Sequence, residues 1–397
     1  MLKIFVTGDN HIGIEYKEHP RKDRLVAERI EAFTRMVDKA NEEGCELFAI
    51  TGDLFEDTEV DDNRVKAVVA ELKRFNGPVA VLPGNHDYYT NTVSVWQTFL
   101  KELESDSQIK LLTDEKPYEY ENFTIYPAVC HSHHSDDNAL GWIKKYNFPD
   151  DGKIRIGMAH GTVEGEAPDE KKQYFYMTRD ELRNIGVNAW LIGHTHVPFP
   201  RHLKENFERV REPIFNPGSH VQPDSATVTE GLCFILEFDE QGKVFAKKFV
   251  SGALRFYKKK LNVLGDLEKT LEKELKECID NSVVELEVKG AVNEDDFKRR
   301  DAIIEQVLKR FLEAKPPVYG DLTILITEKK IDKNFPETSL YSKMLKELSP
   351  KSEKTDAELE QMTQDQKDEY LRELQTARKQ TQMAFNLILG KEEKNNK

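Results

Sequence analysis

Long apolar runs and paired cysteines are both missing from this 397-residue sequence. No stretch approaches the roughly 18 apolar residues that a membrane-spanning helix needs, so we expect no membrane association. The start, from Met1 to Gly13, lacks the basic stretch and the small-residue cleavage site of a secretory signal. Its four cysteines form no Cys-x-x-Cys pair, which argues against a disulfide framework and a structural zinc site. We therefore expect a protein of the reducing cytoplasm.

A surplus of basic residues is also lacking, because the formal net charge is −14. Proteins that bind nucleic acids usually carry a basic surface, so the bulk charge gives no support to such a partner. It does not exclude one either, because bound divalent metal ions would neutralise some of the carboxylates. The length is sufficient for two or three domains with buried cores.

From Leu2 to Val250, short apolar stretches alternate with longer amphipathic ones, which is typical of a layered α/β domain. We expect strands at Leu2–Val6, Leu47–Ile50, Val79–Leu82, Phe123–Val129, Ile154–Ala159, Ala189–Ile192, Leu232–Phe238 and Val244–Val250, and helices near Leu25–Glu43 and Arg64–Phe75. The last two strands follow each other closely, which predicts a mixed sheet.

The pattern changes after Gly252. We expect a helix near Leu267–Cys278, a strand at Val283–Val288, a helix near Glu294–Ala314, a strand at Leu322–Ile326, and helical structure from about Ser339 onward. The sequence therefore predicts an α/β domain over residues 1–252, a small α/β domain over 253–335, and a helical segment over 336–397.

Five of the predicted strands each lead directly into a loop that contains Asp, Asn or His. These loops are Gly8–His11, Gly52–Asp53, Gly84–Asp87, His160–Gly161 and Gly193–His196. Loops at the carboxyl ends of strands in α/β sheets converge on one crevice, so these side chains can meet. A lone Asp-x-His or His-x-His is more often an ordinary surface or core pair, and Gly-Asn-His-Asp after a strand is more selective. The five motifs together indicate a functional site.

The residue types indicate a metal centre. Asp, Asn and His without a thiolate fit Mn, Fe or Zn at an open, catalytic site. The ligands are too many for one ion. A pair of divalent ions about 3.5 to 4 Å apart, bridged by one carboxylate, would use them and would serve phosphoester hydrolysis.

These motifs resemble those of the calcineurin-like metallophosphoesterases, whose pattern is Asp-x-His, Gly-Asp, Gly-Asn-His-Asp, a later His, and Gly-His-x-His. The matching stretches lie between Met1 and Gly218. The sequence is most similar to the SbcD-type DNA repair nucleases of the meiotic-recombination-eleven family, through Gly13, the Asp53–Glu56 stretch and the small domain after Gly252. The resemblance implies a four-layer α/β sandwich with a small α/β cap domain and a helical carboxyl-terminal segment.

The resemblance also implies two divalent metal ions, Mn²⁺ in this family, and a role for each matching residue. One ion would be held by Asp9, His11 and His196, the other by Asn85, His160 and His194, with Asp53 as the bridge. His86 would stabilise the pentavalent phosphorus or protonate the leaving oxygen. Asp87 would orient His86, or alternatively cap a following helix.

Several basic residues flank the expected cleft and could contact phosphates of a substrate, although a solvated surface explains them equally well. The residues that we assign to substrate binding are Arg21, Lys22, Arg201 and His220. The cluster from His131 to His134 could suggest a third metal site. We favour an exposed loop, because none of its members matches a ligand position of the family.

The function implied by the resemblance is metal-dependent exonuclease and endonuclease activity on DNA in double-strand break repair. The partner would be an SbcC-type SMC-like coiled-coil ATPase that binds the helical segment, and the nuclease would form a homodimer. Apolar stripes at Leu340, Met344, Leu345 and Leu348, and at Leu371, Leu374, Met383, Leu387 and Leu389, could dock on such a partner or pack on their own domain.

Two alternatives stay open. The first is a phosphatase or phosphodiesterase that acts on a nucleotide or another small ester, which the acidic charge and the pair Tyr88 and Tyr89 favour. The second is an interaction protein with a decayed metal site, which the complete set of ligands disfavours.

Overall fold

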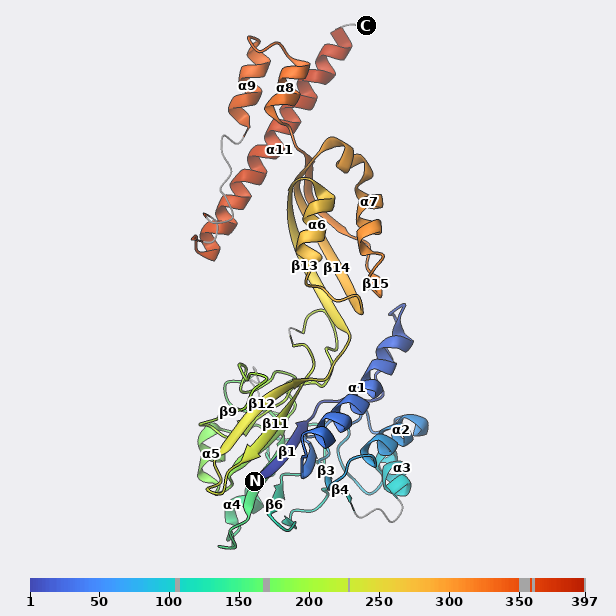
Figure 1. Ribbon diagram of the computed structural model, residues 1–397, viewed down its shortest axis with the longest axis vertical. Helices are drawn as coiled ribbons and strands as arrows, with labels where there is room; N and C mark the ends of the chain where they lie inside the picture. The colour runs from blue at the N-terminus through green and yellow to red at the C-terminus, as the bar shows by residue number, and fades with distance from the viewer. Residues whose placement is uncertain (104–107, 167–171, 228, 350–357, 359–360, 396–397) are drawn as a thin grey trace. The chain divides into compact units, whose positions relative to one another are not determined.

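The computed structural model describes residues 1–103, 108–166, 172–227, 229–349, 358 and 361–395 (Figure 1). The chain divides into two compact units, Met1–Arg255 and Phe256–Lys397. The three-part division expected from the sequence stays a prediction. None of the described helices is long and apolar enough to cross a membrane.

The first unit contains two sheets. The larger sheet has the order β4-β3-β2-β1-β11-β12-β9, formed by Ile109–Leu111, Val79–Val81, Leu47–Ile50, Leu2–Thr7, Leu232–Phe238, Val244–Val250 and Glu208–Arg209. The smaller sheet has the order β10-β8-β7-β6-β5, formed by Ile214–Phe215, Ala189–Gly193, Ile154–His160, Phe123–Pro127 and Tyr118–Glu119. Strands β1 to β4 are parallel, and so are β6, β7, β8 and β10, whereas β11, β12 and β5 run antiparallel to their neighbours.

The two sheets and the helices that cover them form four layers, because side chains alternate between the two faces of each strand. In β2, Phe48 and Ile50 face a core shared with helices, while Leu47 and Ala49 face a core between the two sheets, as a period of two requires. Helices α1 (Lys22–Glu42), α2 (Asp62–Leu72) and α3 (Ser94–Leu103) cover the larger sheet. Helices α4 (Gly141–Lys145) and α5 (Arg179–Asn184) cover the smaller one. The predicted α/β sandwich is confirmed.

The second unit begins with an α/β layer that has its own core. Strand β14 (Ser282–Val292) lies beside β13 (Arg255–Gly265) and pairs in parallel with β15 (Glu313–Ala314) and β16 (Val318–Ile324). Helices α6 (Leu267–Leu275) and α7 (Glu294–Leu308) bury apolar side chains with this sheet. Helices α8 (Glu328–Asn334), α9 (Leu340–Leu348) and α11 (Gln364–Asn395) share a smaller core around Phe335, Leu345 and Phe385.

The elements differ from the sequence predictions mainly in this second unit. The helix predicted to reach Ala314 ends at Leu308, and Glu313–Ala314 forms β15 instead, so that part of the prediction is wrong. Strand β13 was not predicted because three consecutive lysines, Lys258 to Lys260, hide its alternation. In the structure, Leu261 and Val263 are buried while Asn262 and Leu264 are exposed, so only one face of β13 contributes to the core.

We expect Phe48→Ala to lower the free energy of unfolding by about 3 to 5 kcal/mol, because the ring is fully buried and its loss leaves a cavity. The ring stacks on Phe5 with centroids 5.0 Å apart and packs against Phe75. Urea titration, monitored by circular dichroism, measures the change in the free energy of unfolding. Leu100→Ala is the control, since this residue of α3 is 44% exposed and should cost less than about 1 kcal/mol. Equal losses for the two variants would contradict the assignment of the core.

Candidate metal centre

The residues predicted to bind metal lie at the carboxyl ends of parallel strands in both sheets. Asp9 follows β1, Asp53 follows β2 and Asn85 follows β3, whereas His160 ends β7 and His194 follows β8. Backbone hydrogen bonds join the first two loops, from Asp9 N to Gly52 O at 3.1 Å and from His11 N to Asp53 O at 2.9 Å. The predicted convergence of these loops on one place is therefore confirmed.

Several of these residues adopt an unusual backbone conformation. The φ angles of Asp9, His11, Asp53 and His196 lie between 47° and 53°, in the left-handed region that costs energy for residues with a side chain. Such strain persists where surrounding contacts hold it and often marks functional sites. Here the backbone hydrogen bonds between the loops supply part of that support.

Two glycines allow the loops to approach closely. A Cβ atom on Gly84 would lie 2.1 Å from Asp53 Oδ1, and one on Gly52 would lie 2.1 Å from His160 Nδ1. Both distances are far below van der Waals contact, and Gly52 also has a φ of 104°. Any side chain at either position would displace a predicted ligand.

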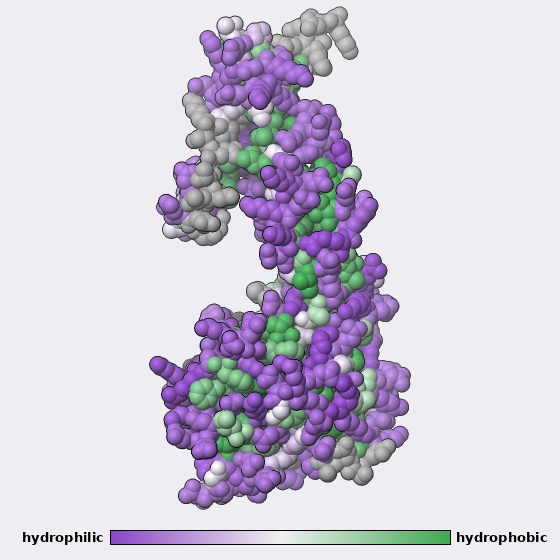
Figure 2. Space-filling view, viewed as in Figure 1, coloured by the Kyte–Doolittle hydropathy of each residue, from purple (hydrophilic) through white to green (hydrophobic). Residues whose placement is uncertain are grey.

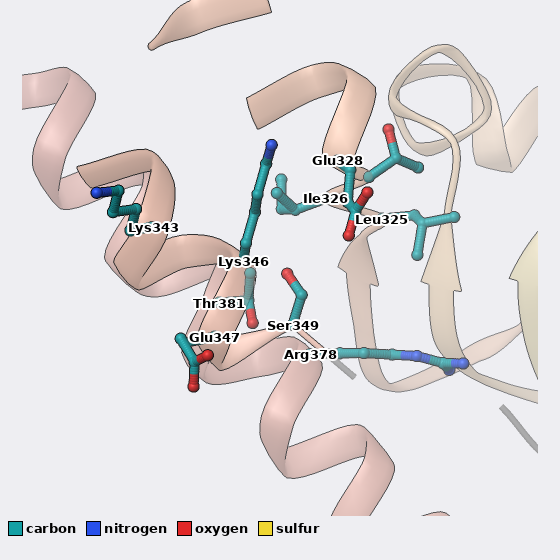
Figure 3. A pocket seen from close by; sticks show the side chains of 10 residues that line it. Leu325, Ile326, Glu328, Lys343, Lys346, Glu347, Ser349, Arg378 and Thr381 are labelled. Atoms are coloured by element: carbon teal, nitrogen blue, oxygen red, sulfur yellow. The ribbon is translucent and has the colours of Figure 1, made fainter. Parts of the chain in front are cut away.

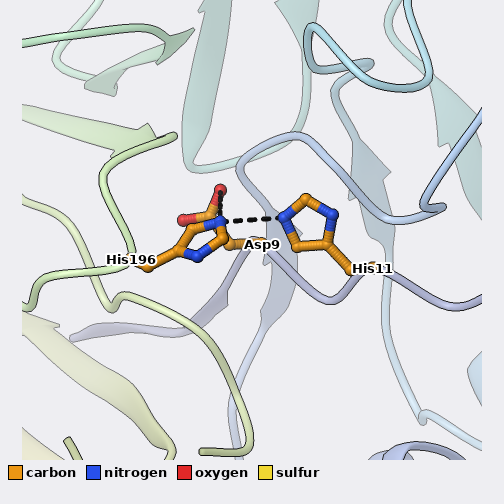
Figure 4. Close-up of side chains that lie close together, drawn as sticks. All are labelled: Asp9, His11 and His196. Carbon is orange, nitrogen blue, oxygen red and sulfur yellow. Dashed lines mark hydrogen bonds and ion pairs between the residues drawn. The ribbon is translucent and has the colours of Figure 1, made fainter. Parts of the chain in front are cut away.

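The first group of possible ligands consists of Asp9, His11 and His196, whose ligand atoms all lie within 4.8 Å of one another (Figure 4). His11 Nε2 lies 2.9 Å from His196 Nε2, and His196 Nε2 lies 3.9 Å from Asp9 Oδ1. Two imidazole nitrogens and a carboxylate oxygen thus converge, and this donor set suits a divalent transition metal.

The second group contains Asp53, His160 and His194. His160 Nε2 lies 3.1 Å from Asp53 Oδ2, and Asn85 Oδ1 lies 3.0 Å from His160 Nε2 and 2.9 Å from His194 Nδ1. Asp53 also belongs to a third group, with His11 and His86. Its Oδ2 atom is 3.7 Å from His11 Nε2, so this carboxylate lies between the two ligand sets as a bridge would.

The outer nitrogens of two histidines are held by neighbouring groups. His160 Nδ1 lies 2.9 Å from Thr51 O, and His11 Nδ1 lies 2.8 Å from Glu56 Oε2. A proton on His160 Nδ1 satisfies the Thr51 carbonyl and leaves Nε2 available to a metal ion, as is common for histidine ligands. Glu56 lies beside His11 as a possible ionic partner. Glu56 was not predicted as part of the site, although its position three residues after Asp53 was the available signal.

Charges at the centre are strongly coupled. Burial opposes the negative charge of Asp53, but the adjacent His160 and His11 outweigh it and hold the pKa of Asp53 far below its usual range. Burial likewise opposes charge on His160, yet Asp53 raises the pKa of His160 to about 9. Burial and the neighbouring His160 lower the pKa of His194 to about 4. A metal ion requires neutral imidazoles, so its binding would release the proton of His160.

His86 and Asp87 lie where the motif suggests but contact different groups from those expected. The half-buried His86 ring lies edge to face with His11, and its Nδ1 is 3.1 Å from Glu56 O. The fully buried Asp87 carboxylate accepts from Phe55 N at 2.9 Å and from Gly84 N at 2.7 Å. Burial and the charge of Asp53 raise the pKa of Asp87 to about 7.

This placement corrects both expectations for Asp87. Its carboxylate makes no described contact with the His86 ring, which Glu56 O orients instead. It caps no described helix either, since α3 begins at Ser94. Asp87 joins the loops after β2 and β3 and is 0% exposed. It therefore positions these loops and does not contact the substrate.

The residues assigned to substrate binding divide into two kinds. Arg21, Lys22 and Arg201 are exposed, as phosphate contacts require. His220 is fully buried, its Nε2 lies 3.0 Å from Arg29 O, and its ring packs on Phe33. The position of His220 is inconsistent with the expected contact, because the chain turns inward after Gly218 and places this ring beneath α1.

Comparisons with known proteins match the part of the chain that contains these residues. Residues 2–198 match the family model described as calcineurin-like phosphoesterase. Among solved structures, the protein TT1561 of Thermus thermophilus is 12% identical, with a TM-score of 0.36 over 62% of this chain and 97% of that one. A dimetal phosphatase from Danio rerio is 11% identical, with a TM-score of 0.35 over 59% of this chain and 94% of that one. No curated protein sequence matches this chain.

A calcineurin-like phosphoesterase model thus matches most of the first unit, residues 2–198 of Met1–Arg255. The three overlapping ligand groups all lie within this matched stretch, and they fit a metal-dependent hydrolase of phosphoester bonds. The more specific similarity to the SbcD type stays a prediction.

We expect Gly84→Ala to abolish metal binding, because the new Cβ would meet the backbone N as well as the carboxylate of Asp53. Metal content after dialysis against Mn²⁺, measured by plasma emission spectrometry, checks this expectation. Gly141→Ala is the matched control, since a Cβ there meets no atom within 4 Å. The thermal unfolding midpoint of each variant separates loss of metal from loss of fold. Wild-type metal content in a folded Gly84→Ala protein would overturn the assignment.

Proposed function

We propose that this protein is a DNA nuclease that uses two divalent metal ions, with Mn²⁺ as the preferred ion. It would act in DNA double-strand break repair as the nuclease subunit of a complex with an SbcC-type SMC-like ATPase. The hydrolytic part of the proposal rests on one observation, which is the three overlapping ligand groups around Asp53 within a calcineurin-like domain. The choice of DNA rests on the resemblance of the motifs and on the features below.

The residues of the chain supply binding and orientation. When bound, divalent ions polarise a phosphoester and lower the pKa of a water molecule. His86 has its Nδ1 held by Glu56 O, and its half-buried ring can therefore present Nε2 to an oxygen of the substrate. Removing a positioned acid or base of this kind typically slows a reaction by about 10²- to 10⁴-fold.

Exposed basic residues support a nucleic-acid substrate. In the first unit these are Arg21, Lys22 and Arg201. Lysine and arginine side chains of this kind bind DNA phosphates without reading the sequence. They would position a strand while the metal centre performs the hydrolysis.

One feature favours the alternative substrate, a nucleotide or another small phosphoester. A hollow of about 830 Å³ beside the metal centre is lined by Glu15, Glu56, Asp57, Glu59 and Asp61, against Lys17 and Arg64. An acidic wall repels a polyanion, and it does so more strongly as the number of phosphates increases. A small ester with a single phosphate would experience less repulsion there.

An assay with Mn²⁺ on labelled single- and double-stranded DNA, beside bis-p-nitrophenyl phosphate, tests the function. We expect Asp53→Asn to lose cleavage together with metal, and His86→Gln to keep its metal while cleavage falls by about 10²-fold or more. Hydrolysis of the generic ester with intact DNA would move the assignment to the small-molecule enzyme. Full cleavage by metal-loaded His86→Gln would remove His86 from the catalytic residues.

The helical part of the second unit supports the proposed partner. The face shown in Figure 2 is mostly hydrophilic, which makes exposed apolar side chains notable. On α9, Leu340 is 77% exposed and Met344 is 41% exposed, and on α11, Met383 and Leu387 are 58% and 61% exposed. Leu345 is buried in the core of its own unit, so the predicted stripe on α9 has one buried part and one exposed part.

A hollow of about 630 Å³ lies between α9 and α11 (Figure 3). Its wall combines apolar residues such as Leu325 and Ile326 with charged ones such as Lys343 and Glu347. An amphipathic helix of a coiled coil has both kinds of surface, and helices commonly bind in grooves of this composition. Homodimer formation stays a prediction of the resemblance.

We expect the double variant Met383→Glu with Leu387→Glu to weaken binding of an SbcC-type coiled-coil segment at least about tenfold, because it places two charges in an apolar contact. Isothermal titration calorimetry measures the affinity. Gln380→Glu, at an exposed position of the same helix, is the control for added charge and should bind as the wild type does. Unchanged affinity in the double variant would show that this face does not bind the partner.

A further inference from the structure

The loop after β6 reaches the metal centre. Strand β6 is parallel to β7, so this loop emerges at the same sheet edge as the one that begins at His160. His133, in this loop, lies with Nδ1 2.9 Å from Asn85 O and with its ring centroid 5.4 Å from that of His86. The cluster from His131 to His134 was predicted to be an exposed loop, and His133 is indeed exposed, but it also contacts Asn85 and His86.

His86 and His133 are oriented in the same way. In each ring Nδ1 lies within hydrogen-bond distance of a backbone carbonyl, Glu56 O for His86 and Asn85 O for His133. Each Nδ1–H can donate to its carbonyl, so Nε2 is the remaining polar atom of each ring. The two rings are nearly perpendicular, with an interplanar angle of 80°. A paired arrangement of imidazoles beside a metal centre is suited to binding a phosphoryl group from two directions.

The loop holds His133 firmly in this position. His131 Nδ1 lies 3.2 Å from Tyr89 O, and Ser132 Oγ donates to His134 O at 2.8 Å. Downstream, Phe175 N donates to Ser135 O at 3.0 Å. Anchors on both sides of His133 reduce the entropy that would be lost when its ring orders against a ligand.

A role as metal ligand fits His133 less well. Among the described residues, the groups of ligand atoms within 4.8 Å of one another include His86 but not His133. His133 Nδ1 also lies 3.4 Å from Asn85 Nδ2, whereas the amide oxygen of Asn85 faces His160 and His194.

We propose that His133 is a second substrate-contacting imidazole, which together with His86 binds the phosphoryl group of the phosphoester at the metal centre. This inference rests on the proposed hydrolytic function and adds a residue to it. His134 does not share the role, because its ring contacts His133 and Tyr174 and has no described contact with Asn85 or His86.

The experiment compares His133→Gln with His134→Gln in the full-length, Mn²⁺-loaded protein. Both residues are exposed, so both variants should fold, and thermal unfolding verifies this. We expect His133→Gln to lower kcat/KM for bis-p-nitrophenyl phosphate by about ten- to a hundredfold, as loss of a hydrogen bond to a charged group does. Inhibition by inorganic phosphate should weaken in the same variant. Metal content should equal that of the wild type, and His134→Gln should keep its activity and its phosphate affinity.

Three results would overturn the proposal. Equal activity of His133→Gln and the wild type would show that the ring does not contact the substrate. Loss of metal in His133→Gln would make the residue a ligand instead. Equal losses in both variants would indicate that the loop as a whole, rather than His133, supports the site. A wild-type protein that is inactive on DNA and on small phosphoesters would contradict the proposed function itself, and this result is distinct from the other three.

Discussion

The arrangement of the site depends on one buried carboxylate. Asp53 is 1% exposed, and its Oδ1 accepts from the backbone N–H of His86 at 2.8 Å while Oδ2 lies 3.1 Å from His160 Nε2. A buried charge is tolerated only when it is paired and hydrogen-bonded. The loops after β2, β3 and β7 must therefore meet at Asp53, and the glycines at positions 52 and 84 are the residues that let them approach. Asp87 accepts hydrogen bonds from backbone N–H groups of two of the same loops. It therefore helps to position Asp53 and does not contact the reacting groups.

Much of the first unit could be predicted from the sequence because its signals are local. Apolar strands such as Leu47–Ile50 and Leu232–Phe238 have the bounds that the sequence predicts, and each ligand loop follows its strand directly. The errors have physical causes. His220 follows a turn that points into the core, and only the packed position of α1 reveals this. His133 was correctly expected in an exposed loop, but its contact with Asn85, 48 residues away in the sequence, had no local signal.

The second unit was harder to predict because its patterns are mixed. Strand β13 places lysines on its solvent face, which makes the sequence resemble a charged linker. The helices α9 and α11 each bury one side, with Leu345 and Phe385, and expose apolar residues on another. Periodicity alone cannot say which apolar side of such a helix packs on its own unit. The substrate class could not be predicted from composition for a related reason, since exposed basic residues and an acidic hollow act in opposite directions on a polyanion.

The predicted ligands come from two separate sheets, so bound metal ions would also hold the sheets together. Asp9, Asp53 and Asn85 belong to the larger sheet, whereas His160, His194 and His196 belong to the smaller one. The sheets otherwise adhere through an apolar core, which resists separation but has little directional preference. Ions bound between them would act as cross-links that fix the sheets against sliding, much as a disulfide fixes two strands. Occupancy of the centre would then stiffen the whole sandwich, and the register between the sheets would be set most rigidly at the place where the substrate reacts.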